Sequence, residues 1–349
     1  MVNNDVTING KVALNGDVHL IICDGKMLTI EIKGDPNEGI NAKDFNFTVH
    51  GQRGNQGKIV AVASTYRAGI QSDSGEITIN GVNVKAKGYH GIKSNSGAIT
   101  IHDSTVEATA SNYGTVSSTG NVIIIGGNVT AKGDVCEGLS AGNDLTLSNC
   151  VATVTGPNNG LHAKNNATFI NATVDVTGES DGIWISNGNL TINGGRVTGR
   201  GNGSSGVGIH AGGSIDISSD VLSVKAFGKK KAIEGTVKNA IPGIGWTDTA
   251  GTTGRANIGT SNAGQTLTYK KVQFPVLDPS EITQVPTAKT DLKSTGSAQK
   301  LITAGAATGG TMYYALGENA TVAPAFDGES TGTNKKWNTS IPTATDAGT

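Results

Sequence analysis

The chain has 349 residues, enough for two or more domains, and its formal net charge is −1. Aromatic residues make up only 4% of it, while 51 residues are glycine, which excludes an aromatic-rich globular enzyme core and is typical of a fold with many turns. The near-zero charge gives no reason to expect nucleic acid or an anionic membrane as a partner. No apolar run is long enough to span a membrane.

The first ten residues contain neither the basic nor the apolar region of a signal peptide. The abundance of Thr, Asn, Gly and Ser nevertheless favours a secreted protein, so we expect an excised part of an extracellular or cell-surface protein. The three cysteines (Cys23, Cys136 and Cys150) lack the spacing of a metal site and are expected to be buried thiols.

In chain order, residues 1–38 contain alternating apolar positions on either side of the turn at Cys23, which predicts an N-terminal β cap. From Gly39 a single unit recurs, most clearly in residues 67–89 and 90–113. Each copy has a Gly-Ile opening or its equivalent, an Ile-Thr-Ile run and a closing Val-x-Val/Ala run, separated by polar turns. The opening glycines are Gly39, Gly69, Gly91, Gly114, Gly138, Gly160, Gly182 and Gly208.

These glycines are 22 to 30 residues apart, which is too short for pairs of helices. Three short strands per unit predict an all-β fold, a parallel β-helix over residues 39–239. The crossover rule for parallel strands predicts that its coil is right-handed.

Stacking the units predicts columns of inward-facing side chains. The first strand supplies two columns, one with Ile70, Ile92, Thr115, Leu139, Leu161, Ile183 and Ile209, and a smaller one with Ser72, Ser94, Ser117, Ala141, Ala163, Ile185 and Ala211. The third strand supplies a column of Val84, Val106, Val129, Ala152, Val174, Val197 and Val224, followed two residues later by a second one. Such mixed large and small residues suit a narrow coil.

Beyond the repeats, residues 240–275 contain larger hydrophobic residues and are predicted to form a C-terminal cap, with Trp246 and Phe274 over the open end of the core. Residues 276–290 form a proline-punctuated linker. Residues 291–349 are predicted to form a second β module, with strands at 299–302, 310–316 and 337–341.

Several short segments resemble the opening of large bacterial cell-surface β-helix proteins. They are Asn9-Gly10, Gly16-Asp17-Val18, residues 20–25, Leu28-Thr29-Ile30 and residues 49–52. The resemblance covers roughly residues 2–275 and implies a pectate-lyase-like fold, in proteins some of which are described as carbohydrate-binding. Residues 291–349 resemble a small Ig-like module of Gram-positive surface proteins. The resemblance implies that this module is truncated, an incomplete β-sandwich, because such modules normally continue with another strand after the segment that corresponds to residues 346–349.

A lyase on this scaffold needs clustered carboxylates and an Arg or Lys base on one outer face, and glycoside hydrolysis needs two carboxylates at a set separation. The outward acidic residues are scattered over the units, although Arg196 and Arg200 could serve as bases. We therefore expect a non-enzymatic adhesin or glycan-binding protein. A calcium-dependent polysaccharide lyase of the pectin type and a purely structural stalk stay open as alternatives.

The outward column of the first strand is predicted to hold Gln71, Lys93, Val116, Ser140, His162, Trp184 and His210. The column before the opening glycine holds Ala68, His90, Tyr113, Glu137, Asn159, Asp181 and Val207. Aromatic rings suit the apolar faces of sugars, and the polar groups suit their hydroxyls. We therefore predict a binding strip for an extended polysaccharide, a host or cell-wall glycan, along Tyr113, Glu137, His162, Asp181, Trp184 and His210. The alternative is that Trp184 only covers a corner beneath the loop at residues 200–206.

Two other outward patterns are weaker. A column of threonines (Thr78, Thr100, Thr146, Thr168 and Thr191) could bind ice but is more simply β-propensity on an exposed strand. No cofactor is expected, although Glu179, Ser180 and Asp181 could hold Ca²⁺ together with Asp134 or Glu137.

Overall fold

The computed structural model describes residues 1–32, 37–64, 66–260, 267–276, 282–290, 292–293, 295–307, 314–315, 337–338 and 341–344. These residues form strands and turns without a helix, so none of them belongs to a helix able to cross a membrane. The chain divides into two compact units, Met1–Val276 and Leu277–Thr349. The all-β prediction is confirmed for the part of the chain that the structure describes.

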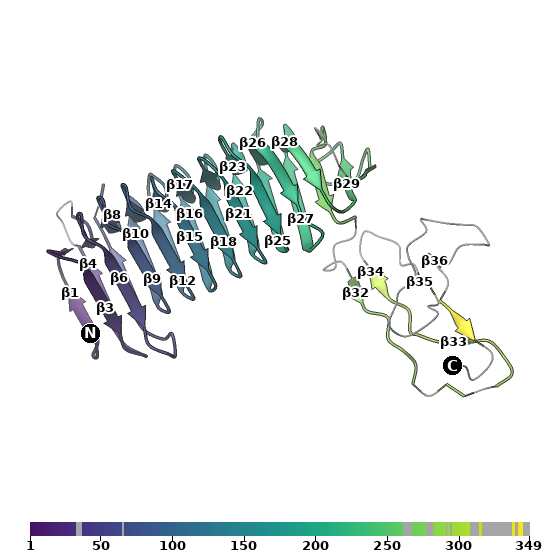
Figure 1. Ribbon diagram of the computed structural model, residues 1–349, viewed down its shortest axis with the longest axis horizontal. Coiled ribbons are helices and arrows are strands. Elements are labelled where there is room, and N and C mark those ends of the chain that lie inside the picture. Colours follow the sequence, from purple (N-terminus) through teal and green to yellow (C-terminus); the bar gives the residue numbers. More distant parts are fainter. Residues whose placement is uncertain are drawn as a thin grey trace. The chain divides into compact units, whose positions relative to one another are not determined.

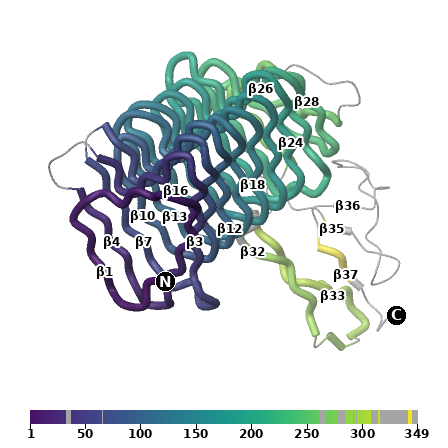
Figure 2. Tube along the Cα trace, turned by 60° about the vertical axis from the view of Figure 1, so that its left-hand side comes forward, coloured from purple at the N-terminus to yellow at the C-terminus, as the bar shows by residue number. Residues whose placement is uncertain are grey.

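The first unit is a parallel β-solenoid of about 10 turns, as predicted (Figures 1 and 2). The first strands of successive turns pair with each other and are β2 (Val12–Ala13), β5 (Ile40–Asn41), β8 (Ala68–Ser72), β11 (His90–Ser94), β14 (Val116–Ser118), β17 (Leu139–Ala141), β20 (Leu161–Ala163), β23 (Asp181–Ile185) and β26 (Val207–Ile217). The second strands are β3 (Val18–Ile22), β6 (Phe47–Gly51), β9 (Ile77–Asn80), β12 (Ile99–His102), β15 (Val122–Ile125), β18 (Leu145–Ser148), β21 (Ala167–Ile170) and β24 (Leu190–Asn193).

In the last turns the first and second strands are continuous. Strand β26 pairs with both β23 and β24 of the preceding turn, and it pairs along most of its length with β28 (Lys231–Asn239) of the next turn. The third strands form a separate sheet and are β1 (Val6–Ile8), β4 (Met27–Glu31), β7 (Lys58–Val62), β10 (Asn83–Gly88), β13 (Thr105–Ala110), β16 (Asn128–Gly133), β19 (Val151–Gly156), β22 (Thr173–Gly178), β25 (Gly195–Gly201) and β27 (Val221–Gly228). Strands β1 to β4 continue the same three ladders, so the predicted cap at residues 1–38 carries turns of the coil itself.

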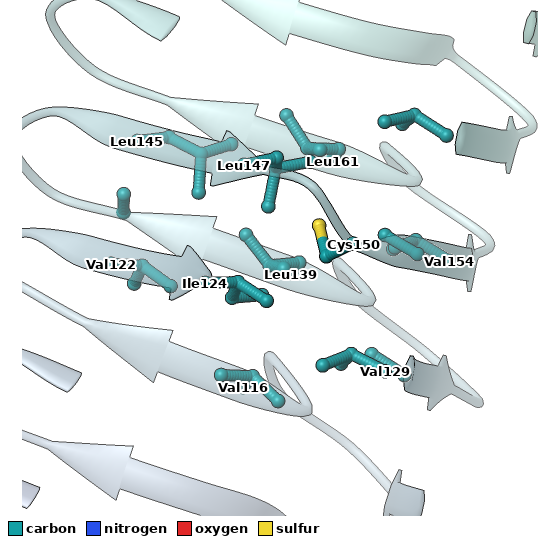
Figure 3. Close-up of a cluster of buried hydrophobic side chains, with 14 of the residues drawn as sticks. Val116, Val122, Ile124, Val129, Leu139, Leu145, Leu147, Cys150, Val154 and Leu161 are labelled. Carbon is teal, nitrogen blue, oxygen red and sulfur yellow. The ribbon is translucent and has the colours of Figure 1, made fainter. Parts of the chain in front are cut away.

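Period-two alternation explains why these segments stack. In β10 and β13, Val84 pairs with Val106 and Ala86 with Ala108, and all four side chains are buried, whereas the residues between them face outward. The same register continues through the third strands, so the predicted third-strand columns are confirmed. Buried side chains from all three ladders meet inside the coil (Figure 3).

One turn differs from the prediction by a single residue. Val116, expected to face outward, is fully buried and pairs with Ile92 and Leu139, and Figure 3 shows it among the core side chains. Ser118 takes the small inward position expected for Ser117, and Ser117 faces outward. The pairing places Thr115 opposite Gly91 and Gly138, where the other turns from β5 to β26 have glycine. Its hydroxyl is buried without a hydrogen-bond partner.

Close packing explains the glycine before the first strand at position 182. A Cβ on Gly182 would collide with the backbone nitrogen of Arg200 and lie 2.6 Å from the carbonyl oxygen of Gly208. Both obstacles are backbone atoms, so they cannot move aside as a flexible side chain would. At Gly182 the third strand and the next turn therefore approach each other at a distance that only glycine allows.

Three antiparallel strands end the solenoid: β29 (Gly243–Trp246), β30 (Ala256–Ile258) and β31 (Lys271–Phe274). Strand β31 extends the third sheet from β27, and Phe274 is fully buried in the core, as predicted. Trp246 is also buried, at 9% exposed, but it is not part of the core cluster that contains Phe274. Trp246 is paired with Lys271, whose Nζ lies 4.5 Å from the indole centroid, and so occupies the opposite side of this sheet from Phe274.

The described part of the second unit consists of three short antiparallel pairs. They join β32 (Ile282–Gln284) to β34 (Ala306–Ala307), β33 (Gln299–Lys300) to β37 (Thr343–Ala344), and β35 (Tyr314–Ala315) to β36 (Trp337–Asn338). Most of the predicted strand at 310–316 and the predicted end at 346–349 lie outside the described residues. The Ig-like assignment stays a prediction.

Replacing Gly182 with alanine tests whether glycine is needed for packing at the start of a first strand. We expect the substitution to destabilise the solenoid by about 2 kcal/mol or more, because backbone must move to make room for the methyl group. Gly16→Ala is the control, since nothing lies within 4 Å of a Cβ at Gly16. Urea unfolding followed by circular dichroism measures both variants, and equal stabilities would contradict the close approach at Gly182.

Candidate functional site

Five of the six predicted site residues lie on one outer edge of the solenoid, here called the outer strip: Glu137, His162, Asp181, Trp184 and His210. His162 pairs with Trp184, and Trp184 with His210, across β20, β23 and β26. The ladder of three residues on successive turns is therefore present as predicted. It continues to Glu234 of β28, which pairs with His210.

Within the strip the His162 and Trp184 rings stack, with centroids 4.5 Å apart and planes 22° from parallel. His162 Nε2 also lies 2.6 Å from Ser186 Oγ. Burial lowers the pKa of His162, and the negative charge of Glu137 opposes this shift. Because His162 covers one face of the indole, a ligand ring can use only the opposite face and the edge of Trp184.

Each carboxylate of the strip has a polar partner. His210 Nδ1 is 2.9 Å from Asp181 Oδ2, and Glu137 Oε1 accepts a hydrogen bond of 3.1 Å from Asn158. Lys230 donates to Glu234 at 3.0 Å, and this hydrogen bond lowers the pKa of Glu234. The strip therefore offers hydrogen-bond donors and acceptors of several kinds, which suits a ligand with many hydroxyl groups.

Tyr113 does not belong to this strip. Gly114 occupies the column position expected for Tyr113, because the corner before β14 is longer than the one before β11. Tyr113 lies instead beside Tyr89, with ring centroids 5.0 Å apart, and Tyr89 lies 5.5 Å from Tyr66. With His90, these residues form a cluster here called the tyrosine corner (Tyr66, Tyr89, His90 and Tyr113).

The sequence contains a signal for this cluster that the strand pattern alone does not reveal. The three tyrosines are 23 and 24 residues apart, the length of one repeat, and they are half of the six tyrosines in the chain. Each precedes a first strand at the corner where the third strand ends. Residues with that spacing in a solenoid lie on neighbouring turns, about 4.8 Å apart along the axis.

Groups suited to other chemistry are not assembled in the described residues. No set of three or more His, Cys, Asp or Glu side chains is arranged there to hold a metal ion, so the proposed calcium ligands do not form a described cluster. Arg200 pairs with Asp175, and its guanidinium carbon lies 5.3 Å from the Phe227 ring centroid. Cys150 is buried as predicted, whereas Cys23 and Cys136 are only partly buried, and all three are free thiols.

The threonine column and a wide cavity lie on the second strands. Thr78, Thr100, Thr146, Thr168 and Thr191 are in register, with Thr48 as a further member, and Ile123 and Asp216 interrupt the column. A cavity of about 730 Å³ borders Thr191, Asp216 and Lys238 near the last turns. It is on a different face of the coil from the outer strip.

No protein-family model, curated protein or solved structure matches this chain. The resemblance to bacterial cell-surface β-helix proteins therefore stays a prediction, and the function has to be argued from the geometry of the site.

The pH dependence of stability tests whether His90 is buried and neutral in the tyrosine corner. Its side chain is 9% exposed, its Nδ1–H donates to the Gly114 carbonyl at 3.0 Å, and burial lowers its pKa from 6.5 to about 4. Between about pH 6.5 and pH 4 the unfolded chain therefore binds a proton that the folded chain does not. Stability should fall as the pH drops through this window, by on the order of 3 kcal/mol from this residue.

Urea unfolding at pH 7.5 and pH 4.5, values that bracket most of this window, measures the effect. We expect His90→Gln to lose less stability on acidification than the parent, because it has no imidazole to protonate. His102→Gln is the control, since the His102 side chain is 46% exposed. If His90→Gln and the parent lose the same amount, His90 is not held neutral by the fold.

Proposed function

We propose that this chain is a non-enzymatic carbohydrate-binding β-solenoid of a bacterial cell surface, which binds an extended glycan along the outer strip. The observation that carries the proposal is the ladder of His162, Trp184 and His210 on three successive turns. It combines an indole, two imidazoles and the neighbouring Asp181 carboxylate on a partly buried edge, where the His210 side chain is 30% and the Asp181 side chain 14% exposed. These are the groups that sugar rings and sugar hydroxyls require.

The repeat of the coil supports a polymer as the ligand. Successive turns present their outer groups about 4.8 Å apart, close to the rise of an extended sugar chain, so neighbouring sugars can meet equivalent positions. The strip is an open edge without walls. Affinity is therefore expected to be modest, on the order of −4 to −7 kcal/mol.

The location at a cell surface is supported by the composition and by the resemblance of residues 2–275 to bacterial surface proteins. A stalk without a ligand is the second reading. In that case the stacked His162 and Trp184 rings only pack against each other at the edge of the solenoid, and no glycan should bind.

A glycan array is the first experiment, followed by Trp184→Ala on any glycan that binds. We expect the substitution to weaken binding roughly tenfold, because it removes the indole face and edge that a sugar ring can contact. Val151→Ala is the matched control, since Val151 is 44% exposed on the outward face of the third-strand sheet. A folded Trp184→Ala variant with parental affinity would place the ligand elsewhere.

A calcium-dependent pectin-type lyase is the rival enzyme. It requires an arginine or lysine base near clustered carboxylates, whereas Arg200 is engaged by Asp175 and the described carboxylates do not cluster. Incubation with polygalacturonate and Ca²⁺, followed by the absorbance of unsaturated products, distinguishes the two. We expect no absorbance increase above a protein-free blank, and sustained turnover would replace the binding proposal with a lyase.

A further inference from the structure

We propose that the tyrosine corner is a second sugar-binding platform, which takes rings of the same extended glycan that lies on the outer strip. The inference rests on the proposed function for the class of ligand. It assigns a role to Tyr66, Tyr89 and His90, which the strand pattern does not select, and it gives Tyr113 a different position from the one predicted.

Exposure is the first observation. Tyr66 is 70% exposed and Tyr113 is 48% exposed, although both are large aromatic residues in a chain with only 4% aromatics. Single exposed apolar residues are ordinary, but a contiguous aromatic group on three neighbouring turns is not. Such a group is typical of a surface that meets a ligand.

Ring orientation is the second observation. The buried His90 ring lies beneath Tyr113, with centroids 5.4 Å apart and planes 24° from parallel. One face of Tyr113 therefore rests on a buried support, and the residue is still 48% exposed. Tyr89 is tilted by 53° to Tyr113 and by 52° to Tyr66, so the tyrosine rings do not cover one another as parallel plates would.

Backbone strain is the third observation. Tyr66 has a φ of 70°, in the left-handed region that bulky side chains seldom adopt. Retaining a tyrosine there costs on the order of 1 to 2 kcal/mol, which a glycine would avoid. The conformation holds the Tyr66 ring 5.5 Å from Tyr89, at the end of the aromatic group.

The phenol groups supply the polar part of the site. Burial raises the pKa of the Tyr89 hydroxyl, and the nearby Tyr113 hydroxyl raises it further. Tyr89 is therefore neutral at physiological pH and can both donate to and accept from sugar hydroxyls. A ring face beside neutral hydroxyl groups suits a carbohydrate better than an ion or a purely apolar ligand.

The two sites lie along one corner of the coil. The register places Tyr113 level with Cys136 on the next turn, then with Asn158 and Ser180. Trp184 is on the same turn as Ser180, three turns from Tyr113, which is roughly 14 Å along the axis. Glu137 of the outer strip and Asn158, joined by a hydrogen bond, lie on the turns between Tyr113 and Trp184. One extended glycan can therefore contact both.

Thiol labelling tests occupancy without a substitution. Cys136 is partly buried next to Tyr113, and burial raises its pKa, so labelling with N-ethylmaleimide is run at about pH 9 and located by peptide mass spectrometry. The probes are soluble xylan, mannan, β-glucan and polygalacturonate. We expect the polysaccharide that binds to slow the labelling of Cys136. Cys23, in the turn between β3 and β4, is the internal control and should react at an unchanged rate.

Affinity measurements on fragments of that polysaccharide supply the second readout. For fragments long enough to reach both sites, Tyr113→Ala should weaken binding roughly tenfold, and Tyr113→Phe, which keeps the ring, should weaken it far less. A fragment too short to reach from Trp184 to Tyr113 can occupy the outer strip or the tyrosine corner, but not both at once. The second site should therefore not raise its affinity. Leu222→Ala is the matched control, because Leu222 is 48% exposed like Tyr113.

Each result separates this inference from the proposed function. If Trp184→Ala weakens binding while Tyr113→Ala does not, and Cys136 labelling is unchanged, the second platform is wrong and the outer strip stands. If only Tyr113→Ala weakens binding, the platform stands and the strip is wrong. Absence of binding to every polysaccharide overturns both. A concentration-dependent dimer that Tyr113→Ala abolishes would assign the tyrosine corner to self-association instead.

Discussion

In-register stacking of parallel strands is the constraint on which the rest of the solenoid depends. Each strand finds its backbone hydrogen-bond partners on the preceding and following turns, as when β13 pairs with β10 on one side and β16 on the other without a shift. One apolar residue per column per turn is then enough to build a single core that runs from Val2 to Phe274. No turn can bury its own face, so stability is a property of neighbouring turns.

The same constraint explains why many of the candidate ligand-binding side chains lie at the corner between the third and first strands. Glycines on both sides of this corner pack backbone against backbone, as at Gly178 and Gly182, and leave no room for side chains in the core there. Some residues between them, such as Tyr113 and Glu179, are exposed, whereas others, such as His90 and Asn159, are buried. Their number can vary, from two before Gly91 to six before Gly208, without changing the register of the strands on either side. Outward side chains at this corner are therefore the freest to acquire a function.

Most of the fold follows from period-two alternation within a repeat, which is why the inward columns and the His162–Trp184–His210 ladder could be predicted. The turn around Tyr113 could not be predicted. Gly114 looks like the other opening glycines, but the corner before it is longer, and Thr115 occupies the position that glycine has in the neighbouring turns. A one-residue slip exchanges the two faces of a strand, which is what happened to Val116. The tyrosine corner was missed for the same reason, since corner length decides which rings meet. Trp246 shows a second limit of prediction from the repeat, because the repeat does not determine how an antiparallel strand is added at the end of the solenoid.

Ring geometry distinguishes what a strand and a corner can offer a ligand. Rings at paired strand positions lie above one another along the coil axis, and His162 and Trp184 are accordingly close to parallel and occupy each other's faces. Such a ladder presents one indole face together with ring edges and polar atoms, so hydrogen bonding contributes more there. At a corner the backbone changes direction, so Tyr89 and Tyr113 are tilted and Tyr113 is supported from beneath by His90. The corner can therefore supply ring faces where the strand supplies hydrogen bonds, and a polymer lying along both would use the two kinds of contact together.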